Sequence, residues 1–169
     1  MNSCNTRAVK AMIEIPKGSS NKYEYDHRSG EFVVDRVLYS PVHYPADYGF
    51  IPETLADDDD PLDILVLVTS PTFPGCTIRV RPIGALAMAD DKGPDTKILS
   101  VPLVDPRLAQ IDDLDQVGNH VLKEIEYFFS IYKDLEGKKV VTSGWQDAGY
   151  AWEIIDQSRR TFATASSKV

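Results

Sequence analysis

The placement of proline restricts the fold of this 169-residue chain more than any other feature. All eleven prolines lie between Pro16 and Pro106, and residues 107–169 contain none. Proline is poorly tolerated inside a helix because it lacks a backbone N–H and clashes with the preceding turn. We therefore expect strands and turns up to Pro106 and helices after it. Since no linker-like tract separates the two parts, we expect one α+β domain over residues 1–169.

Several segments before Pro106 combine β-branched and aromatic residues with turn residues at their ends, which is typical of strands. The segment 26–30 predicts a hairpin turn in which Gly30 takes positive φ. The run 64–68 has no alternation, which indicates a strand buried on both faces. Short antiparallel strands without intervening helices favour a small closed or half-closed barrel over a doubly wound sheet. The strand candidates are residues 9–15, 22–26, 31–38, 64–68, 77–88 and 97–104.

After Pro106 the apolar residues change to helical spacing and form two stripes, both of which are expected to face the core. The first stripe predicts a helix that ends at Gly137, and a short strand over residues 139–142 can follow it. The chain ends, residues 1–8 and 163–169, are expected to be flexible. The first stripe comprises Val121, Leu122, Ile125, Phe128, Phe129 and Tyr132, and the second comprises Ala148, Ala151, Trp152, Ile155 and Phe162.

The charge balance and the cysteine count limit the classes of partner and compartment. Acidic residues outnumber basic ones 26 to 18, giving a net charge of −8, which disfavours non-specific binding to nucleic acid or anionic lipid. A small phosphate ligand stays possible if the site supplies its own cations. Two cysteines, Cys4 and Cys76, do not indicate a disulfide framework, and residues 1–18 lack the apolar core of a secretion signal. We expect a cytoplasmic protein without a membrane span.

An acidic run, residues 57–63, leads directly into the apolar strand candidate 64–68. Two carboxylates about 4 Å apart repel by about 4 kcal/mol at an effective dielectric near 20, so a solvated acidic turn is one interpretation. Because the run joins a core strand, however, Asp63 should lie at the edge of the interior, where hard cations stabilise carboxylates. A second acidic group, residues 90–97, is compatible with an ordinary turn. Together the two groups predict loops that supply a polynuclear magnesium site.

Basic and phenolic side chains occur in unusual places. Lys22, Arg36 and Lys97 lie in or beside strand candidates, Tyr44 and Tyr48 share a proline-bearing extended segment, and Tyr132-Lys133 follows the first helix. Taken alone, each of these bases is compatible with an ordinary side chain whose charged end reaches water, and each tyrosine is compatible with an ordinary half-buried phenol, rather than with a ligand-binding residue. The chain has no Gly-rich phosphate loop, no Gly-x-Ser-x-Gly, no His-Glu-x-x-His and no Cys-x-x-Cys.

These segments together resemble the soluble, magnesium-dependent inorganic pyrophosphatases of family I, in their bacterial form. The resemblance covers about residues 9–160 in unbroken order, and its most specific part is the signature Asp58-Asp59-Asp60-Pro61-Leu62-Asp63. The other matching segments are Ile13-Glu14-Ile15-Pro16, Lys22-Tyr23-Glu24, Val34-Asp35-Arg36, Tyr44-Pro45-Ala46-Asp47-Tyr48-Gly49, Arg81-Pro82-Ile83-Gly84, residues 90–97, Phe128-Phe129 and Tyr132-Lys133-Asp134-Leu135-Glu136.

The resemblance implies a five-stranded OB-like β-barrel flanked by two C-terminal helices, in a mainly β protein of the α+β class. It implies an inorganic diphosphatase that hydrolyses pyrophosphate to two orthophosphates by direct attack of a metal-activated water. Several Mg²⁺ ions would serve as cofactors in each site. The bacterial form is usually a cytoplasmic homohexamer, which we expect here as well.

The resemblance also assigns roles to individual residues. It implies that Asp60 orients and deprotonates the attacking water, and that Asp60, Tyr48, Arg36 and Lys133 are the catalytic residues. Asp91 stands where many family members have Glu, so it is not counted as a ligand, and His27 is expected to be exposed in a turn. The implied metal ligands are Asp58, Asp63, Asp90, Asp95 and Glu24, with Asp63 bridging two ions. The implied phosphate-binding residues are Lys22, Arg36, Tyr48, Tyr132 and Lys133, with Lys97 and Tyr44 in support, and Glu14 lines the cavity.

Two other functions compete with hydrolysis. An OB-like module can bind single-stranded nucleic acid, but that use needs a basic groove with aromatic platforms, whereas this chain is acidic. A non-catalytic protein that binds divalent cations needs the carboxylates but not Lys22, Arg36, Lys97 and Lys133. Pyrophosphate and phosphate are therefore the expected partners, rather than nucleic acid or a membrane.

Overall fold

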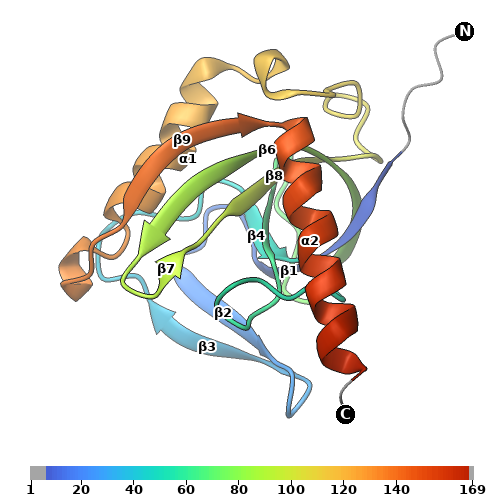
Figure 1. Cartoon of the computed structure of the whole chain (residues 1–169). Coiled ribbons are helices and arrows are strands. Elements are labelled where there is room, and N and C mark those ends of the chain that lie inside the picture. Colours follow the sequence, from blue (N-terminus) through green and yellow to red (C-terminus); the bar gives the residue numbers. More distant parts are fainter. Residues whose placement is uncertain (1–6, 168–169) are drawn as a thin grey trace, which may run out of the picture.

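A closed ring of five strands forms the centre of the structure, a computed structural model that describes residues 7–167 (Figure 1). The strands pair in the order β1, β4, β5, β8, β6, and β6 pairs with β1 to close the ring. This mainly β arrangement confirms the predicted architecture. The ring consists of β1 (Val9–Ile15), β4 (Asp47–Phe50), β5 (Asp63–Val66), β6 (Thr77–Asp90) and β8 (Lys97–Pro102).

The expectation of antiparallel pairing is wrong for one pair in the ring. β5 and β8 are parallel, with Leu65 opposite Leu99. The long strand β6 lies between them in the chain and runs in the opposite direction, pairing antiparallel with β8. This return strand takes the place of the helical crossover that usually joins parallel neighbours.

The remaining strands lie outside the ring. β2 (Asn21–Asp26) and β3 (Glu31–Val37) form a separate hairpin. Its turn is the predicted one, because Gly30 has a φ of 74° and its N–H donates to the Asp26 carbonyl at 2.8 Å. β7 (Gly93–Pro94) folds back on the end of β6, and β9 (Val141–Asp147) pairs with the other edge of β6.

Two α-helices follow the last proline, as predicted, namely α1 (Asn119–Ile131) and α2 (Ala148–Ser166). Two single-turn 3₁₀ helices, η1 (Leu114–Gln116) and η2 (Asp134–Glu136), lie before and after α1. The first helix therefore ends before Gly137, which terminates η2 instead. Residues 163–166 belong to α2, and the flexibility of this end stays a prediction. The predictions for residues 1–6, Cys4 included, and for residues 168–169 lie outside the described residues.

Most of the ring is buried on both faces, whereas β1 and the first residues of β6 alternate between buried and more exposed side chains. Each α-helix covers one face of the ring. Leu65 packs in a cluster with Phe129 of α1, whereas its neighbours Ile64 and Val66 pack in a second cluster with Ile155 of α2. Ile64, Leu65 and Val66 are fully buried, which confirms the prediction for residues 64–66, whereas residues 67 and 68 lie beyond the end of β5 and are half-buried. Full burial of such a side chain contributes about 1.5–3 kcal/mol, so β5 is a rigid support for the residues at its ends.

Two strands differ from the sequence prediction for local reasons. β4 contains Gly49, a residue that weakens strands, but a Cβ at this position would lie 1.8 Å from the carbonyl oxygen of Met12. Only glycine therefore allows β4 to approach β1. β9 begins later than predicted and includes Gly144, whose φ of 94° accompanies a register shift against β6. In the described part of the chain, no helix is long and apolar enough to cross a membrane.

Candidate functional site

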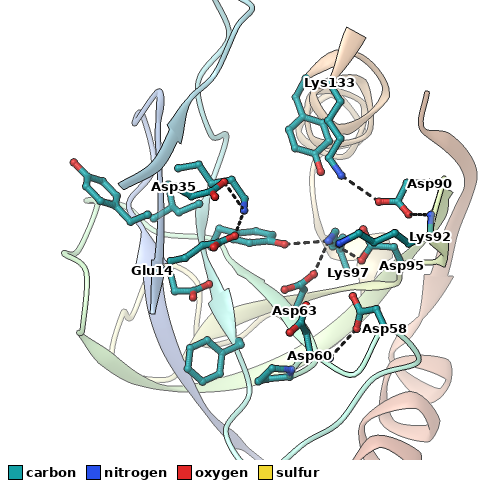
Figure 2. A pocket seen from close by; sticks show the side chains of 18 of the residues that line it. Glu14, Asp35, Asp58, Asp60, Asp63, Asp90, Lys92, Asp95, Lys97 and Lys133 are labelled. Carbon is teal, nitrogen blue, oxygen red and sulfur yellow. Dashed lines mark hydrogen bonds and ion pairs between the residues drawn. The ribbon is translucent and has the colours of Figure 1, made fainter. Parts of the chain in front are cut away.

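A polar cavity of about 390 Å³ opens between the ring, the β2–β3 hairpin and the segment after α1 (Figure 2). Figure 2 shows Glu14 and Asp35 on one side, Asp90 and Lys92 on the other, and Asp63 between them. The structure thus brings the two acidic groups of the sequence into one site. The predicted site residues that line the cavity are Glu14, Lys22, Glu24, Arg36, Tyr48, Asp58, Asp60, Asp63, Asp90, Asp95, Lys97, Tyr132 and Lys133.

Charged side chains of both signs dominate the cavity wall. The carboxylates outnumber the bases, so the cavity is negative overall and an anionic ligand needs additional cations. Nine carboxylates line it, namely Glu14, Glu24, Asp35, Asp58, Asp60, Asp63, Asp90, Asp91 and Asp95. Six bases line it, namely Lys22, Arg36, Lys92, Lys97, Lys133 and Lys138.

The inner ion group, defined as Lys97 with Asp63, Asp95 and Tyr48, lies at the floor of the cavity. Lys97 is 3% exposed, and its Nζ lies 2.5 Å from Asp63 Oδ2, 2.7 Å from Asp95 Oδ1 and 3.0 Å from the Tyr48 hydroxyl. Burial acts to lower the pKa of Lys97, but Asp63 and Asp95 outweigh it and raise that pKa. The ammonium therefore stays charged, and its three donors all have acceptors.

Tyrosine side chains support the inner ion group. Burial raises the pKa of Tyr48 well above its ordinary value, so the phenol stays protonated. Because its oxygen accepts from Lys97, the phenol proton remains available for a ligand. Tyr44, to which the resemblance gave a supporting role, is 1% exposed, and its ring centroid lies 5.5 Å from that of Tyr48. It packs against Tyr48 and, among residues 7–167, is not part of the cavity lining.

The hairpin ion group, defined as Lys22, Glu24, Asp35 and Arg36, forms the opposite wall on β2 and β3. Lys22 pairs with Glu24 and lies 3.3 Å from Asp35 Oδ2, which also accepts from Arg36 Nη1 at 2.9 Å. The antiparallel register places Lys22 opposite Arg36, so the two cations lie side by side on one wall. These side chains are 19–48% exposed and therefore more solvated than the inner ion group.

A third ion pair closes the cavity near the end of α1. Lys133 Nζ lies 3.1 Å from Asp90 Oδ2, and Asp90 Oδ1 accepts from the Lys92 backbone N–H at 2.9 Å. Burial acts to raise the pKa of Asp90, but these two contacts outweigh it and lower that pKa. Burial acts to lower the pKa of Lys133, but Tyr132 and Asp90 raise it. Both groups are therefore ionised near neutral pH.

The acidic loop before β5 presents Asp58 and Asp60 to the cavity. Asp58 Oδ1 accepts from the Asp60 backbone N–H at 3.1 Å, and the intervening Asp59 has a φ of 66°. This left-handed residue turns the chain so that its neighbours face the cavity. Burial, followed by the charges of Asp58 and Asp63, raises the pKa of Asp60. Asp60 is thus a carboxylate with increased proton affinity beside other acids.

Glu14 on β1 is the most perturbed carboxyl group of the site. Burial raises its pKa to about 7, although the hydrogen bond from the Tyr25 backbone N–H at 2.9 Å and the charge of Lys22 act in the opposite direction. Glu14 lines the cavity, which is where the resemblance placed it. This group is partly protonated near neutral pH.

The donor chemistry of the cavity fits hard divalent cations. The carboxylates offer oxygen ligands, which Mg²⁺ prefers, and their excess over the bases leaves uncompensated negative charge. Within residues 7–167, no group of three or more Asp, Glu, His or Cys side chains is arranged to hold a metal ion as it stands. Lys97 Nζ lies between Asp63 and Asp95, so these carboxylates would have to exchange part of that pairing for a metal ion.

Sequence reasoning left several lining residues without a role. Asp35 was noted only as part of a matching segment, yet it joins Lys22 to Arg36. Asp91, Lys92 and Lys138 also line the cavity. Asp91 and Lys92 belong to the acidic group 90–97 of the sequence, which assigned neither a role, and no sequence signal pointed to Lys138. His27 is exposed as predicted, but its ring packs against Tyr25 at the cavity margin, with 4.8 Å between ring centroids.

Known proteins match this chain over most of its length. The family model described as inorganic pyrophosphatase matches residues 11–163. The inorganic pyrophosphatase of Halalkalibacterium halodurans is 50% identical over 151 residues, which cover 89% of this chain and 93% of that protein. The inorganic pyrophosphatase of Methanosarcina acetivorans is 52% identical over 151 residues, covering 89% of this chain and 90% of that protein.

Solved structures match the fold as well. The inorganic pyrophosphatase of Thermus thermophilus superimposes with a TM-score of 0.90 at 44% identity, covering 96% of this chain and 95% of that chain. The inorganic pyrophosphatase of Helicobacter pylori superimposes with a TM-score of 0.91 at 37% identity, covering 96% of this chain and 98% of that chain. The likeness therefore extends over nearly the whole fold rather than over the motifs alone.

Proposed function

Because the chain belongs to the inorganic pyrophosphatase family, we propose that its cavity binds pyrophosphate and hydrolyses it to two orthophosphates. Membership of this family confirms the resemblance seen in the sequence. One observation carries the function, namely that nine carboxylates and six bases line the same cavity. A nucleic-acid groove does not need the carboxylates, and a cation-binding protein does not need the bases.

Family I pyrophosphatases are metal-dependent, and we propose Mg²⁺, with several ions in the site. Asp58, Asp63 and Asp95 would hold the first ion, with Asp63 shared with a second. Asp90, Asp95 and Glu24 would hold ions that accompany the substrate. When bound, Mg²⁺ neutralises substrate charge and lowers the pKa of water in the site.

The side chains of the cavity divide the chemical roles between them. Asp60 receives the proton of the attacking water, because its carboxylate lines the cavity and no basic side chain among residues 7–167 forms an ion pair with it. Lys22, Arg36 and Lys133 neutralise the phosphates, including the charge that develops on the leaving group. The hydroxyl groups of Tyr48 and Tyr132 donate to phosphate oxygens. Attack is direct, so no side chain acts as a covalent nucleophile.

Substrate binding exchanges ion-pair partners that already exist. Lys22 and Lys133 each have a carboxylate partner in the cavity. A phosphate oxygen replaces that partner, and the released carboxylate becomes available to the cations that enter with the substrate. Lys97 is different, because its three acceptors are protein groups on the floor of the cavity. Its predicted support of the phosphates is therefore indirect, through the position of Tyr48.

Phosphate release from inorganic pyrophosphate is the direct test of the proposed function. We expect release with Mg²⁺ and its loss when the metal is chelated, with recovery when Mg²⁺ is restored. No release in the presence of Mg²⁺ would refute the proposal. Tight binding of a polynucleotide at physiological salt would favour the nucleic-acid alternative instead.

We further propose that the chain assembles as a homohexamer in the cytoplasm. The likeness to the bacterial form supports the assembly, and the acidic composition with two cysteines suits a reducing compartment. Sedimentation should then give about six chain masses. A stable monomer would refute the assembly without affecting the chemistry of the cavity.

A further inference from the structure

The single-turn helix η2 directs two side chains across the mouth of the cavity. Lys133 is its N-cap and Glu136 is its last residue, three positions later. Residues three apart on a 3₁₀ helix lie on the same face. Gly137 ends the turn with a φ of 72°, a conformation that costs glycine little, and its N–H donates to the Asp134 carbonyl. The turn thereby directs Lys133 toward Asp90 and Glu136 toward Arg36.

Arg36 is held at two of its three nitrogen atoms. Its Nη1 lies 2.9 Å from Asp35 Oδ2, and its Nε lies 3.0 Å from Glu136 Oε1. The guanidinium is planar, so a carboxylate beside Nη1 and another beside Nε restrict its orientation as well as its position. Nη2, which has no ion-pair partner among residues 7–167, is available to an anion in the cavity.

Glu136 contacts Arg36 from behind and does not contribute to the cavity lining among residues 7–167. Its side chain is 8% exposed, and Arg36 is its ion-pair partner. Within the same residues, Oε2 of Glu136 and Nε of Arg36 are buried without a well-directed hydrogen bond. A buried carboxylate with one oxygen left without a partner costs stability, so its effect on Arg36 is a better reason for its presence than folding.

We infer that Glu136 is a positioning residue that orients the guanidinium of Arg36 for the substrate phosphate. The inference rests on the proposed function, because that function assigns Arg36 to phosphate binding. Glu136 touches neither substrate nor metal in this role and acts only through Arg36. Its contribution should therefore appear in substrate affinity and disappear when Arg36 is replaced.

A double-mutant cycle tests this dependence. Binding of imidodiphosphate, a pyrophosphate analogue that is not hydrolysed, is measured by calorimetry with Mg²⁺ present for the wild type, Glu136→Gln, Arg36→Lys and the double variant. We expect Glu136→Gln to weaken binding about tenfold in the wild-type background and less than about twofold in the Arg36→Lys background, where the guanidinium Nε is absent. In turnover assays KM should rise by a similar factor, while kcat stays within about threefold.

Asp134→Asn supplies the matched control, because it removes one negative charge from the same turn at an exposed position. It should change analogue affinity less than about twofold, which separates orientation of Arg36 from a general change in charge. Glu136→Asp keeps the charge one methylene farther from Nε and should restore part of the affinity that Glu136→Gln loses.

Three results would overturn the inference. They are equal effects of Glu136→Gln in both Arg36 backgrounds, an effect of Glu136→Gln no larger than that of Asp134→Asn, and a lower Tm with unchanged affinity of the folded protein. The last result would make Glu136 merely structural. Absence of phosphate release by the wild type would refute the proposed function separately, since the cycle is measured from analogue binding.

Discussion

The inner ion group and the hairpin ion group contain the same kinds of side chain in opposite environments. The charged side chains of the inner ion group are 4–25% exposed between strands of the closed ring, whereas those of the hairpin ion group are 19–48% exposed. Removing the partner of a buried charge costs several kcal/mol of stability, whereas a solvated pair contributes about 0–1 kcal/mol. The pairs on the floor of the cavity are therefore costly to break unless another cation replaces Lys97, whereas Lys22 on the hairpin can exchange its partners for a ligand at little cost.

Asp60 gives the largest expected effect because it belongs to neither group. Among residues 7–167 no basic side chain forms an ion pair with it, so its carboxylate is free to accept a proton. Asp60→Asn should lower kcat by about 10²–10⁴, the usual range for loss of a general base, while substrate binding persists. Steady-state phosphate release measures the change. Asp59→Asn, next to it but outside the cavity lining, should stay within a few fold, and the reverse pattern would show that the assignment is one residue out of register.

Removal of the ammonium from the inner ion group should give the next largest effect. Lys97→Met leaves Asp63 and Asp95 half-buried without their shared cation, which should lower the free energy of unfolding by about 3–5 kcal/mol. Urea unfolding at pH 7 in the presence of a chelator measures this loss. A change below about 1 kcal/mol, the range of a solvated pair, would remove the distinction between the two groups.

Asp63 has Lys97 as an ion-pair partner, whereas Glu14 has no ion-pair partner among residues 7–167. The charge of Glu14 should therefore lower the stability of the folded protein. Its folded-state pKa of about 7 lies above the ordinary 4.5, so the folded protein binds the extra proton and stability falls as pH rises from about 4.5 to 7. At roughly 1.4 kcal/mol per pKa unit, the loss is at most about 3.5 kcal/mol. Glu14→Gln keeps an acceptor for the Tyr25 N–H and should raise Tm at pH 8 but not at pH 4.5, without metal. The exposed Glu153→Gln variant serves as control. If Tm depended on pH in the same way in both variants, the loss of stability assigned to the buried charge of Glu14 would be refuted.

Lys22→Met should have the smallest effect on stability. Its partners are partly exposed, so the free energy of unfolding should fall by less than about 1 kcal/mol. The same substitution should raise KM for pyrophosphate about tenfold, since the cation is needed for the ligand rather than for the fold. Chemical unfolding and steady-state kinetics on one preparation measure both quantities. A large loss of stability with unchanged KM would reverse the comparison.

The sequence was sufficient for residues whose chemistry is visible locally. Asp63 could be placed at the edge of the core because it directly precedes an apolar strand, and the hairpin turn followed from Gly30. The family motifs then supplied the other lining residues. Pairings across the fold were not visible in this way. Lys97 meets Asp63 from 34 residues away, and Arg36 meets Glu136 from the far end of α1, so both depend on ring closure and helix packing.

Strand β4 shows that a backbone conformation, too, can depend on contacts that the local sequence does not reveal. Its glycine argues against a strand when only local propensity is considered, but the approach of β1 excludes every other residue at that position. The parallel pairing of β5 with β8 was missed for a related reason, because the direction of a strand in a ring depends on all the connections around it.

Ring closure also governs how the chain can be made. β1 is the first strand of the chain, yet one of its edges stays open until β6 arrives, and β5 needs β8 as a partner. A nascent chain that has not yet passed Pro102 therefore exposes strand edges, which are templates for pairing between molecules. Synthesis of the N-terminal half therefore passes through a stage with open strand edges, and the arrival of β8 completes the ring. The two apolar faces of the ring that α1 and α2 cover stay exposed until the chain after Pro106 follows.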